Sequence, residues 1–272
     1  MKSKLENFDL SEITSSIKQL GRKKTSVLYN VSMSSVDRYC TKYGICVHEG
    51  SIKRGNPNQR NNTIDDSELK DMCFKHYLIG LISSDGHVSN NNVKIYQKNA
   101  EYLKGIKQKL KSKSGEHIHK KQGGVYEAVI YSKLLQQECK KYMESDKRYS
   151  LKPYNCADKW ESDYVRGLFD GDGCIHYVYR SGTLVNASMT ICTGSPFMRD
   201  YLTGYFTRKG ISFNVNEQIS VNKYWVIGPS RADDIILFID ELYKDPSAYK
   251  LQSKYIKCVK YLKLREIDKM MT

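Results

Sequence analysis

One nine-residue pattern occurs twice in this chain of 272 residues and constrains its fold more than any other feature. The first copy reads LIGLISSDG from residue 78, and the second reads VRGLFDGDG from residue 165. Each copy is an apolar helical stretch that ends in a carboxylate followed by glycine. Small residues stand four positions apart in each copy, Gly80 with Ser84 and Gly167 with Gly171, and such a stripe permits close approach of a partner backbone. The two copies therefore predict a tightly packed helix pair.

Asp85 and Asp172 lie in the last turns of these two predicted helices. The negative end of the helix dipole disfavours a carboxylate there, and packing the helices together would add repulsion between like charges. A cation is therefore expected beside them. Carboxylate and carbonyl oxygens are ligands that Mg²⁺ prefers, and metals a few ångströms apart stabilise the attacking and leaving oxygens in many nucleases.

The paired motifs resemble those of single-chain homing endonucleases of the LAGLIDADG family, whose name spells the pattern. The resemblance implies that Asp85 and Asp172 bind catalytic Mg²⁺ or Mn²⁺. It also implies that the backbone carbonyls of Ser84 and Gly171 are further metal contacts.

An alternative interpretation is structural. In it, both motifs are ordinary buried helices whose ends are capped by Gly86 and Gly173 in the left-handed conformation. A purely structural basic protein would not explain why the motif occurs twice.

The charge balance favours a polyanionic partner. The chain has 44 Lys and Arg against 30 Asp and Glu, a formal net charge of +14, which makes nucleic acid the first expectation. No stretch approaches the roughly 18 apolar residues of a membrane span, and the polar start lacks a signal-peptide core. We therefore expect an intracellular protein, cytoplasmic or nucleoid-associated, with no membrane partner. The eight cysteines form no C-x-x-C pair, which favours reduced core thiols over zinc ligands or disulfides.

Residues 1–46 have the pattern of a small helical domain. A helix capped by Ser11 should end at Gly21, a second should span about residues 23–29, and a third should follow Ser32 with Val36 facing inward. The segment resembles the helix-turn-helix of DNA-binding proteins. That resemblance implies base-edge contacts from Met33, Ser34, Asp37 and Arg38, and phosphate contacts from Arg22, Lys23, Lys24 and Lys42. A small bundle without DNA contacts is the alternative.

Residues 47–70 are predicted to be a polar linker, rich in Gly, Pro and Asn. Its basic residues, among them Lys53 and Arg54, could follow a phosphate backbone, although a solvated tether explains them equally well.

The rest of the chain is predicted to form two similar halves, residues 71–157 and 158–272. Each reads helix, strand pair, helix, strand pair, helix, so the expected class is α+β with two pseudo-symmetric αββαββα halves. Strands are expected near 87–88, 93–98, 116–120, 125–131, 174–180, 184–193, 211–220 and 223–227. The repeat implies a pseudo-twofold axis, which suits the two strands of a DNA duplex. In the resembled family the two sheets form a saddle over the major groove.

One predicted strand has an alternating pattern. Phe213, Val215 and Ile219 should form an apolar face, and Asn214, Asn216 and Gln218 an amide face that can bond to adenine edges. In the first half, Lys94 and Lys98 are candidates for guanine edges. A solvated sheet face is the alternative.

Further catalytic residues follow from the resemblance. A polar residue that positions water corresponds to Gln97, and its second-half counterpart falls near Thr193 or Gly194. A basic residue near the scissile phosphate corresponds to Lys152 in the first half, and to Lys250 or Lys254 in the second. The mismatch between the halves predicts two unequal active sites.

These observations predict a monomeric, metal-dependent double-strand DNA endonuclease of a mobile genetic element. Its target would be a long asymmetric sequence, and cleavage would leave short 3′ overhangs. An RNA maturase or a DNA-binding regulator could keep the same fold and lose cleavage, but retention of both Asp85 and Asp172 argues against that.

Overall fold

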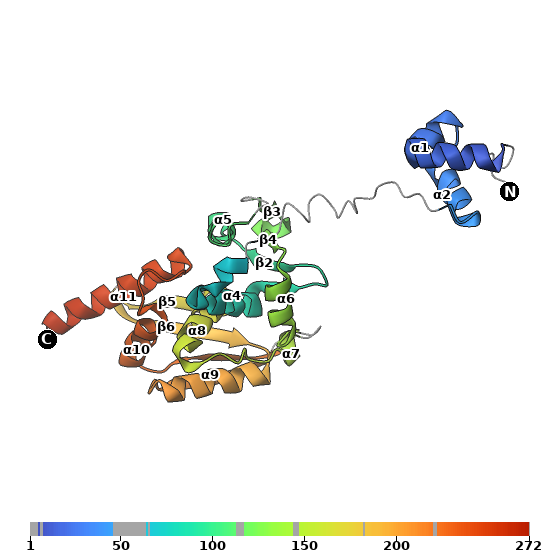
Figure 1. Ribbon diagram of the computed structural model, residues 1–272. Helices are drawn as coiled ribbons and strands as arrows, with labels where there is room; N and C mark the ends of the chain where they lie inside the picture. Colours follow the sequence, from blue (N-terminus) through green and yellow to red (C-terminus); the bar gives the residue numbers. More distant parts are fainter. Residues whose placement is uncertain are drawn as a thin grey trace. The chain divides into compact units, whose positions relative to one another are not determined.

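The computed structural model describes residues 5, 8–45, 64, 66–112, 117–143, 147–181, 183–219 and 222–271 (Figure 1). Contacts divide the chain into two compact units, Met1–Asn58 and Gln59–Thr272. No helix in the described part of the chain has both the length and the apolar composition needed to cross a membrane.

The first unit contains α1 (Leu10–Leu28) and α2 (Met33–Lys42). Asp9, rather than Ser11, caps α1, because its carboxylate accepts hydrogen bonds from the backbone N–H groups of Ser11 and Glu12. The predicted break at Gly21 is wrong, since one continuous helix includes it; an interior glycine costs a helix only about 1 kcal/mol relative to alanine. The predicted cap of α2 is confirmed, because Ser32 accepts a hydrogen bond from the Ser35 N–H.

The small core of this unit lies between α1 and α2. It is made of Leu5, Ile13, Ile17, Val36, Tyr39 and Cys40. The inward orientation predicted for Val36 is therefore confirmed.

The first half of the second unit begins with a short 3₁₀ helix and then repeats strand pairs and helices. Its elements are η2 (Asp66–Lys70), α4 (Met72–Asp85), β1 (Gly86–Val88), β2 (Val93–Gln97), α5 (Ala100–Lys109), β3 (His119–Lys120), η3 (Gln122–Gly124), β4 (Tyr126–Ile130), α6 (Lys133–Lys140) and α7 (Lys147–Ser150). Ile64 and Leu69 are buried in the core of this unit, so it starts before the expected boundary at residue 71.

The second half repeats this order. Its elements are α8 (Asp158–Asp172), β5 (Gly173–Arg180), β6 (Thr183–Thr193), α9 (Pro196–Arg208), β7 (Phe213–Ile219), β8 (Lys223–Pro229), α10 (Ala232–Tyr243) and α11 (Gln252–Met271). The strand orders are β1-β2-β4-β3 and β5-β6-β8-β7, and all described pairings are antiparallel. The two sheets therefore share one topology, which confirms the predicted α+β class.

The strand register decides which side chains reach the core. In the first sheet, Ile95 pairs with Ala128, and both lie on the buried face that α4 and α5 cover. In the second sheet, Ile191 pairs with Ile227 on the buried face, against which α9 and α10 pack. Each sheet thus buries one face and presents the alternate residues of its strands on the other.

Strand β7 departs from the prediction. Val215 is 40% exposed and Ile219 is 79% exposed, so the predicted apolar face is wrong for these two residues. The reason is position: β7 is the edge strand of its sheet, and Ile219 is its last residue.

The seven described cysteines are free thiols, and Cys46 lies outside the described residues. Cys40, Cys139 and Cys258 are buried as expected. Cys174 is exposed, because it lies on the outer face of β5.

Candidate active site

The helices α4 and α8 cross at their glycines. A Cβ atom on Gly80 would overlap the carbonyl oxygen of Tyr164, and one on Gly167 would overlap that of Tyr77. The two backbones are therefore in direct contact, as the small-residue stripes predict. This contact fixes where the C-terminal ends of both helices lie.

The two motif ends meet at Ser84 and Gly171. A Cβ on Gly171 would overlap the Ser84 side chain and would lie 3.3 Å from Asp85 Oδ2. Asp85 therefore lies beside the residue that precedes Asp172. Neither helix ends in a left-handed residue: Gly86 has φ −101° and Gly173 has φ −83°, because each glycine begins the following strand. The capping conformation proposed in the structural alternative is therefore wrong.

Gln97 is the last residue of β2 and reaches Asp85. Its Nε2 atom donates a hydrogen bond to Asp85 Oδ2. Gln97 follows Val93 and Ile95 in the alternation of β2, which directs its side chain to the side of the sheet on which α4 lies. The structure thus brings together two residues that the sequence analysis assigned to one site.

Lys254, in the first turn of α11, lies at the end of α8. Its ammonium donates to the carbonyl oxygens of Phe169 (2.6 Å), Asp170 (2.9 Å) and Gly171 (3.2 Å). A cation in this position offsets the negative end of the α8 dipole. Burial lowers the pKa of Lys254, while the charges of Asp170, Asp85 and Asp172 oppose that shift. Lys254 is therefore within electrostatic reach of all three carboxylates.

Asp170 is fully buried behind the site. Its Oδ2 atom accepts hydrogen bonds from the Tyr77 hydroxyl (2.7 Å) and the Leu251 N–H (2.6 Å), which ties α8 to α4 and to the segment before α11. Burial raises the pKa of this carboxyl. Its first-half counterpart is Ser83, whose hydroxyl donates to the Ile79 carbonyl oxygen instead. The buried hydrogen bonds near the ends of the two motif helices therefore differ.

The counterpart of Gln97 is also different. Asn99 caps α5 and Ser195 caps α9, and this correspondence aligns Gln97 with Thr193. Thr193 has a short side chain, and its Oγ1 atom accepts a hydrogen bond from the Ser195 N–H at 3.1 Å. The positions that correspond to Gln97 therefore hold different side chains in the two halves.

The other two lysines with predicted catalytic roles lie in different settings. Lys250 Nζ donates to the carbonyl oxygens of Pro246 and Ala248, within its own loop. Lys152 is exposed in the segment that joins the halves, and its backbone N–H donates to the Tyr142 carbonyl at 3.0 Å. The sequence pattern left Lys250 and Lys254 as alternatives, and the start of α11 at Gln252 is what brings Lys254 to the carboxylates.

The site contains hard oxygen donors. Among the described residues, no group of three or more His, Cys, Asp or Glu side chains is arranged to hold a metal ion. The two motif carboxylates and the carbonyl of Ser84 are oxygen groups of the kind that Mg²⁺ and Mn²⁺ prefer. The carbonyl of Gly171, which the resemblance assigns to a metal, accepts a hydrogen bond from Lys254.

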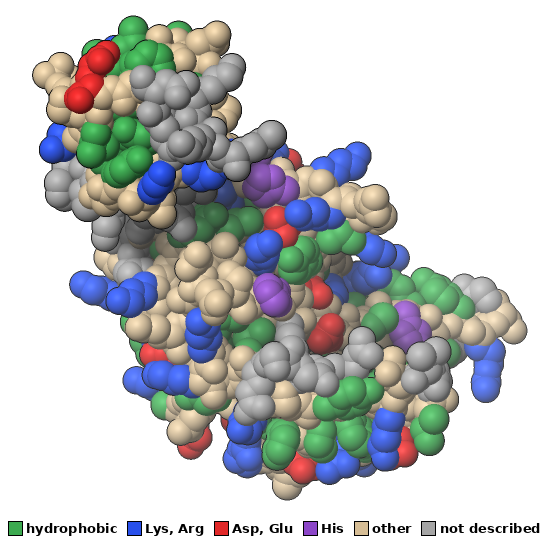
Figure 2. Space-filling view, turned by 90° about the vertical axis from the view of Figure 1, so that its right-hand side faces the viewer, with side chains coloured by type: hydrophobic (Ala, Val, Ile, Leu, Met, Phe, Trp, Pro, Cys, Tyr) green, Lys and Arg blue, Asp and Glu red, His purple; other side chains and the backbone are tan. Residues whose placement is uncertain are grey.

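The outer faces of both sheets are polar. On β7, Asn214, Asn216 and Gln218 are exposed, and on the first sheet Lys98 is exposed while Lys94 is half-buried. Lys94 forms an ion pair with Glu127 at 3.4 Å. Figure 2 shows Lys and Arg side chains spread over the visible face of the molecule, with carboxylates among them.

In the first unit, most of the residues expected to contact DNA are exposed. These are Lys23, Lys24, Met33, Ser34, Arg38 and Lys42. Arg22 and Asp37 form an ion pair with each other at 2.9 Å. Lys53 and Arg54 lie outside the described residues.

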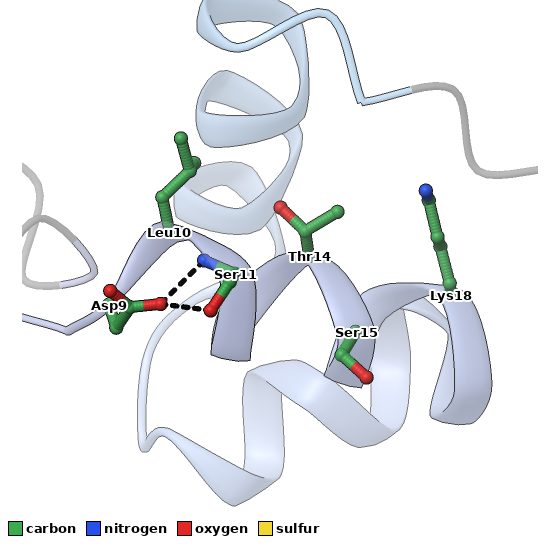
Figure 3. Close-up of a pocket in the computed structure, with 6 residues that line it drawn as sticks. All are labelled: Asp9, Leu10, Ser11, Thr14, Ser15 and Lys18. Carbon is green, nitrogen blue, oxygen red and sulfur yellow. Dashed lines mark hydrogen bonds between the residues drawn. The ribbon is translucent and has the colours of Figure 1, made fainter.

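A pocket lies at the start of α1, and none of its lining residues is among the predicted site residues (Figure 3). Asp9, Leu10, Ser11, Thr14, Ser15 and Lys18 line it. The Asp9 carboxylate is committed to capping α1, since it accepts hydrogen bonds from the N–H and hydroxyl groups of Ser11. The acidic side chain of this pocket therefore has a structural role at the start of the helix.

Comparison with known proteins identifies the region of the first motif. Residues 75–143 match the family model of the LAGLIDADG-like domain. None of the curated proteins matches the chain in sequence.

Several solved structures resemble the chain. The homing endonuclease I-DmoI is 17% identical, with a TM-score of 0.44, over 64% of this chain and 90% of its own. The LAGLIDADG homing endonuclease I-GzeII, in complex with its DNA target, is 13% identical, with a TM-score of 0.49, over 72% of this chain and 91% of its own. The meganuclease I-SmaMI, bound to DNA, is 12% identical, with a TM-score of 0.48, over 72% of this chain and 90% of its own.

The second half of the unit, which begins with α8, repeats both the motif and the sheet topology of the matched region. Residues 75–143 are therefore a LAGLIDADG-like domain, and the second half of the unit has the same sheet topology.

Proposed function

We propose that the protein is a metal-dependent, sequence-specific endonuclease that cuts both strands of a DNA duplex. The observation that carries the proposal is the meeting of two motif helices at glycines, with Asp85 and Asp172 at adjoining ends. Packing alone would not require a carboxylate at either helix end, where the helix dipole disfavours it. A site that uses both carboxylates explains why the motif is repeated.

Asp85 and Asp172 would hold divalent metal, with the carbonyl of Ser84 as a further oxygen donor. When bound, Mg²⁺ or Mn²⁺ supplies an activated water and offsets the charge that develops on the phosphate and the leaving oxygen. The amide of Gln97 orients the Asp85 carboxylate by its hydrogen bond to Oδ2. The ammonium of Lys254 holds positive charge beside both carboxylates and is the basic residue that we assign to the second half. Lys152 and Lys250 remain candidates for contact with phosphate.

The sheets and the first unit would supply recognition. Amides on the outer face of β7 suit adenine edges, and Lys94 and Lys98 suit guanine edges. The helices α1 and α2 would lengthen the target through the exposed residues of α2 and the lysines of α1. Two pseudo-symmetric halves in one chain suit a monomer on a long asymmetric site, with short 3′ overhangs as the family resemblance implies.

A DNA-binding regulator with the same fold and no cleavage is the second candidate. One observation favours it: the Gly171 carbonyl, which the resemblance assigns to a metal, accepts a hydrogen bond from Lys254. The two candidates make the same prediction for binding and different predictions for cleavage.

The test uses a plasmid that carries the DNA flanking this reading frame joined into an uninterrupted sequence. Incubation with the protein and Mg²⁺ should yield linear plasmid cut at one site, and EDTA should prevent the cut. Binding of that site without cleavage in Mg²⁺ or Mn²⁺ would favour the second candidate. Failure to bind the site would contradict both.

A further inference from the structure

Glu127 is a buried carboxylate on the outer face of the first sheet. It pairs with Tyr96 on β2 and with His119 on β3, so its side chain lies on the face opposite the core residues Ile95 and Ala128. Its side chain is only 5% exposed. An acidic group in the middle of a face that we propose to contact DNA requires a reason, because it repels phosphate and the acceptor edges of bases.

Two lysines and a tyrosine surround Glu127. Lys121 Nζ lies 3.1 Å from Oε1, and Lys94 Nζ lies 3.4 Å from Oε2. The Tyr96 hydroxyl also forms a hydrogen bond with the carboxylate. Burial alone would raise the pKa of Glu127, but the hydrogen bonds from Lys121 and Tyr96 and the charge of Lys94 outweigh it and lower the pKa. The carboxylate is therefore ionised, and the cluster carries one net positive charge instead of two.

An ion pair of this kind restricts where an ammonium can be. Free lysines follow the nearest phosphate, which attracts them equally to any sequence. An ammonium held by Glu127 keeps N–H donors for the acceptor atoms of a base edge, but it presents them from one position. The ion pairs with two long lysine side chains accord with the burial of Glu127 on an outer face.

We propose that Glu127 is a positioning residue for DNA recognition. It holds Lys94 and Lys121 in place on the outer face of the first sheet and weakens the attraction of this surface to DNA of any sequence. Specificity thus comes from an acidic residue that does not itself need to contact a base. The proposal rests on the proposed function, since it requires that this face binds DNA.

The test compares Glu127→Gln with Glu101→Gln in the full chain. Both substitutions remove one negative charge, but Glu101 is an exposed residue of α5, paired with Lys104 on the helix side of the sheet. Fluorescence anisotropy would measure binding to a mixed-sequence duplex and to a duplex selected by the wild-type protein, each at several salt concentrations. We expect Glu127→Gln to bind the mixed-sequence duplex at least about threefold more tightly, with a salt slope steeper by about one, and to discriminate less between the duplexes. Glu101→Gln should change the affinity for the mixed-sequence duplex, the salt slope and the discrimination by less than Glu127→Gln does.

Equal effects of the two substitutions would overturn the proposal, as would a Glu127→Gln protein that melts earlier but binds both duplexes as the wild type does. If Glu127→Gln does not fold, Lys94→Met gives the second test: it should lose discrimination without gaining affinity for the mixed-sequence duplex. Unchanged discrimination in that variant would also overturn the proposal. Failure of the wild-type protein to bind either duplex would instead contradict the proposed function.

Discussion

At the scale of single residues, the electrostatics of the site centre on Lys254. Its ammonium donates to three carbonyl oxygens at the end of α8 and lies near the carboxylates of Asp85, Asp170 and Asp172. Lys254 therefore supplies fixed positive charge where acidic groups and the negative end of a helix dipole meet.

Replacement of Lys254 by methionine should reduce cleavage about 100-fold or more, because it removes a fixed charge from the place where phosphate charge develops. Binding of the target should change little. Lys257→Met is the matched control, since Lys257 is an exposed lysine of the same helix and has no assigned role. Single-turnover cleavage and anisotropy would measure both effects. Equal loss of cleavage in the two variants would refute the assignment of Lys254.

Asp170 should make stability depend on pH. Burial raises the pKa of Asp170, so the folded state binds this proton more tightly than the unfolded state. Its contribution to stability is complete below pH 3.8 and is lost as the pH rises through the folded-state pKa. Asp170→Asn should therefore gain stability relative to the wild type as pH increases, by at most about 1.4 kcal/mol per pH unit.

Urea unfolding at several pH values would measure this difference. Asp240→Asn, at an exposed position of α10, controls for the loss of an acidic residue. Parallel stability curves for Asp170→Asn and the wild type would contradict the expectation.

At the scale of elements, the contact between α4 and α8 is the part of the structure that sequence reasoning predicts best. The signal is local: small residues at helical spacing mark the crossing, and each motif aspartate ends its helix. The close approach leaves no room for a Cβ at either crossing glycine. A side chain there must move a backbone, which costs more than moving a flexible side chain.

Gly80→Ala should lower the free energy of unfolding by about 1 to 3 kcal/mol, and activity should fall with it because the carboxylates are pushed apart. Gly204→Ala in α9 is the matched control. Its Cβ would approach only the movable Arg208 guanidinium, at 3.0 Å, so this change should be neutral or stabilising by up to about 1 kcal/mol. Chemical denaturation would measure both. Equal stabilities of the two variants would mean that the helices do not touch as described.

Other elements depend on information that the sequence pattern lacks. The helix α1 continues through Gly21 because the free-energy cost of a glycine inside a helix is small and packing can offset it. The pairing of Glu127 with Lys94 and Lys121 depends on strand register, and the choice of Lys254 over Lys250 depends on where α11 starts. Local spacing identified the motif carboxylates and the family resemblance identified Gln97, whereas the structure's contacts between distant segments identified their neighbours.

At the scale of the whole molecule, the chain combines a helical unit with a unit of two sheets. Deletion of residues 1–58 should shorten the DNase footprint and weaken binding, because tethered contacts add through effective concentration. Cleavage should persist at high protein concentration, since the carboxylates lie in the other unit. An unchanged footprint would show that residues 1–58 do not bind DNA.

We propose that the two carboxylates at the joined ends of α4 and α8 together support cleavage of both strands. The direct test follows a supercoiled plasmid with one target site over time in Mg²⁺, using the wild type, Asp85→Asn and Asp172→Asn. The wild type should give open-circle DNA and then linear DNA, because Gln97, which binds Asp85, is replaced by Thr193 at the corresponding position of the second half. Each variant should bind the target with unchanged affinity and form little or no linear product. Normal conversion to linear DNA by either variant would contradict the account.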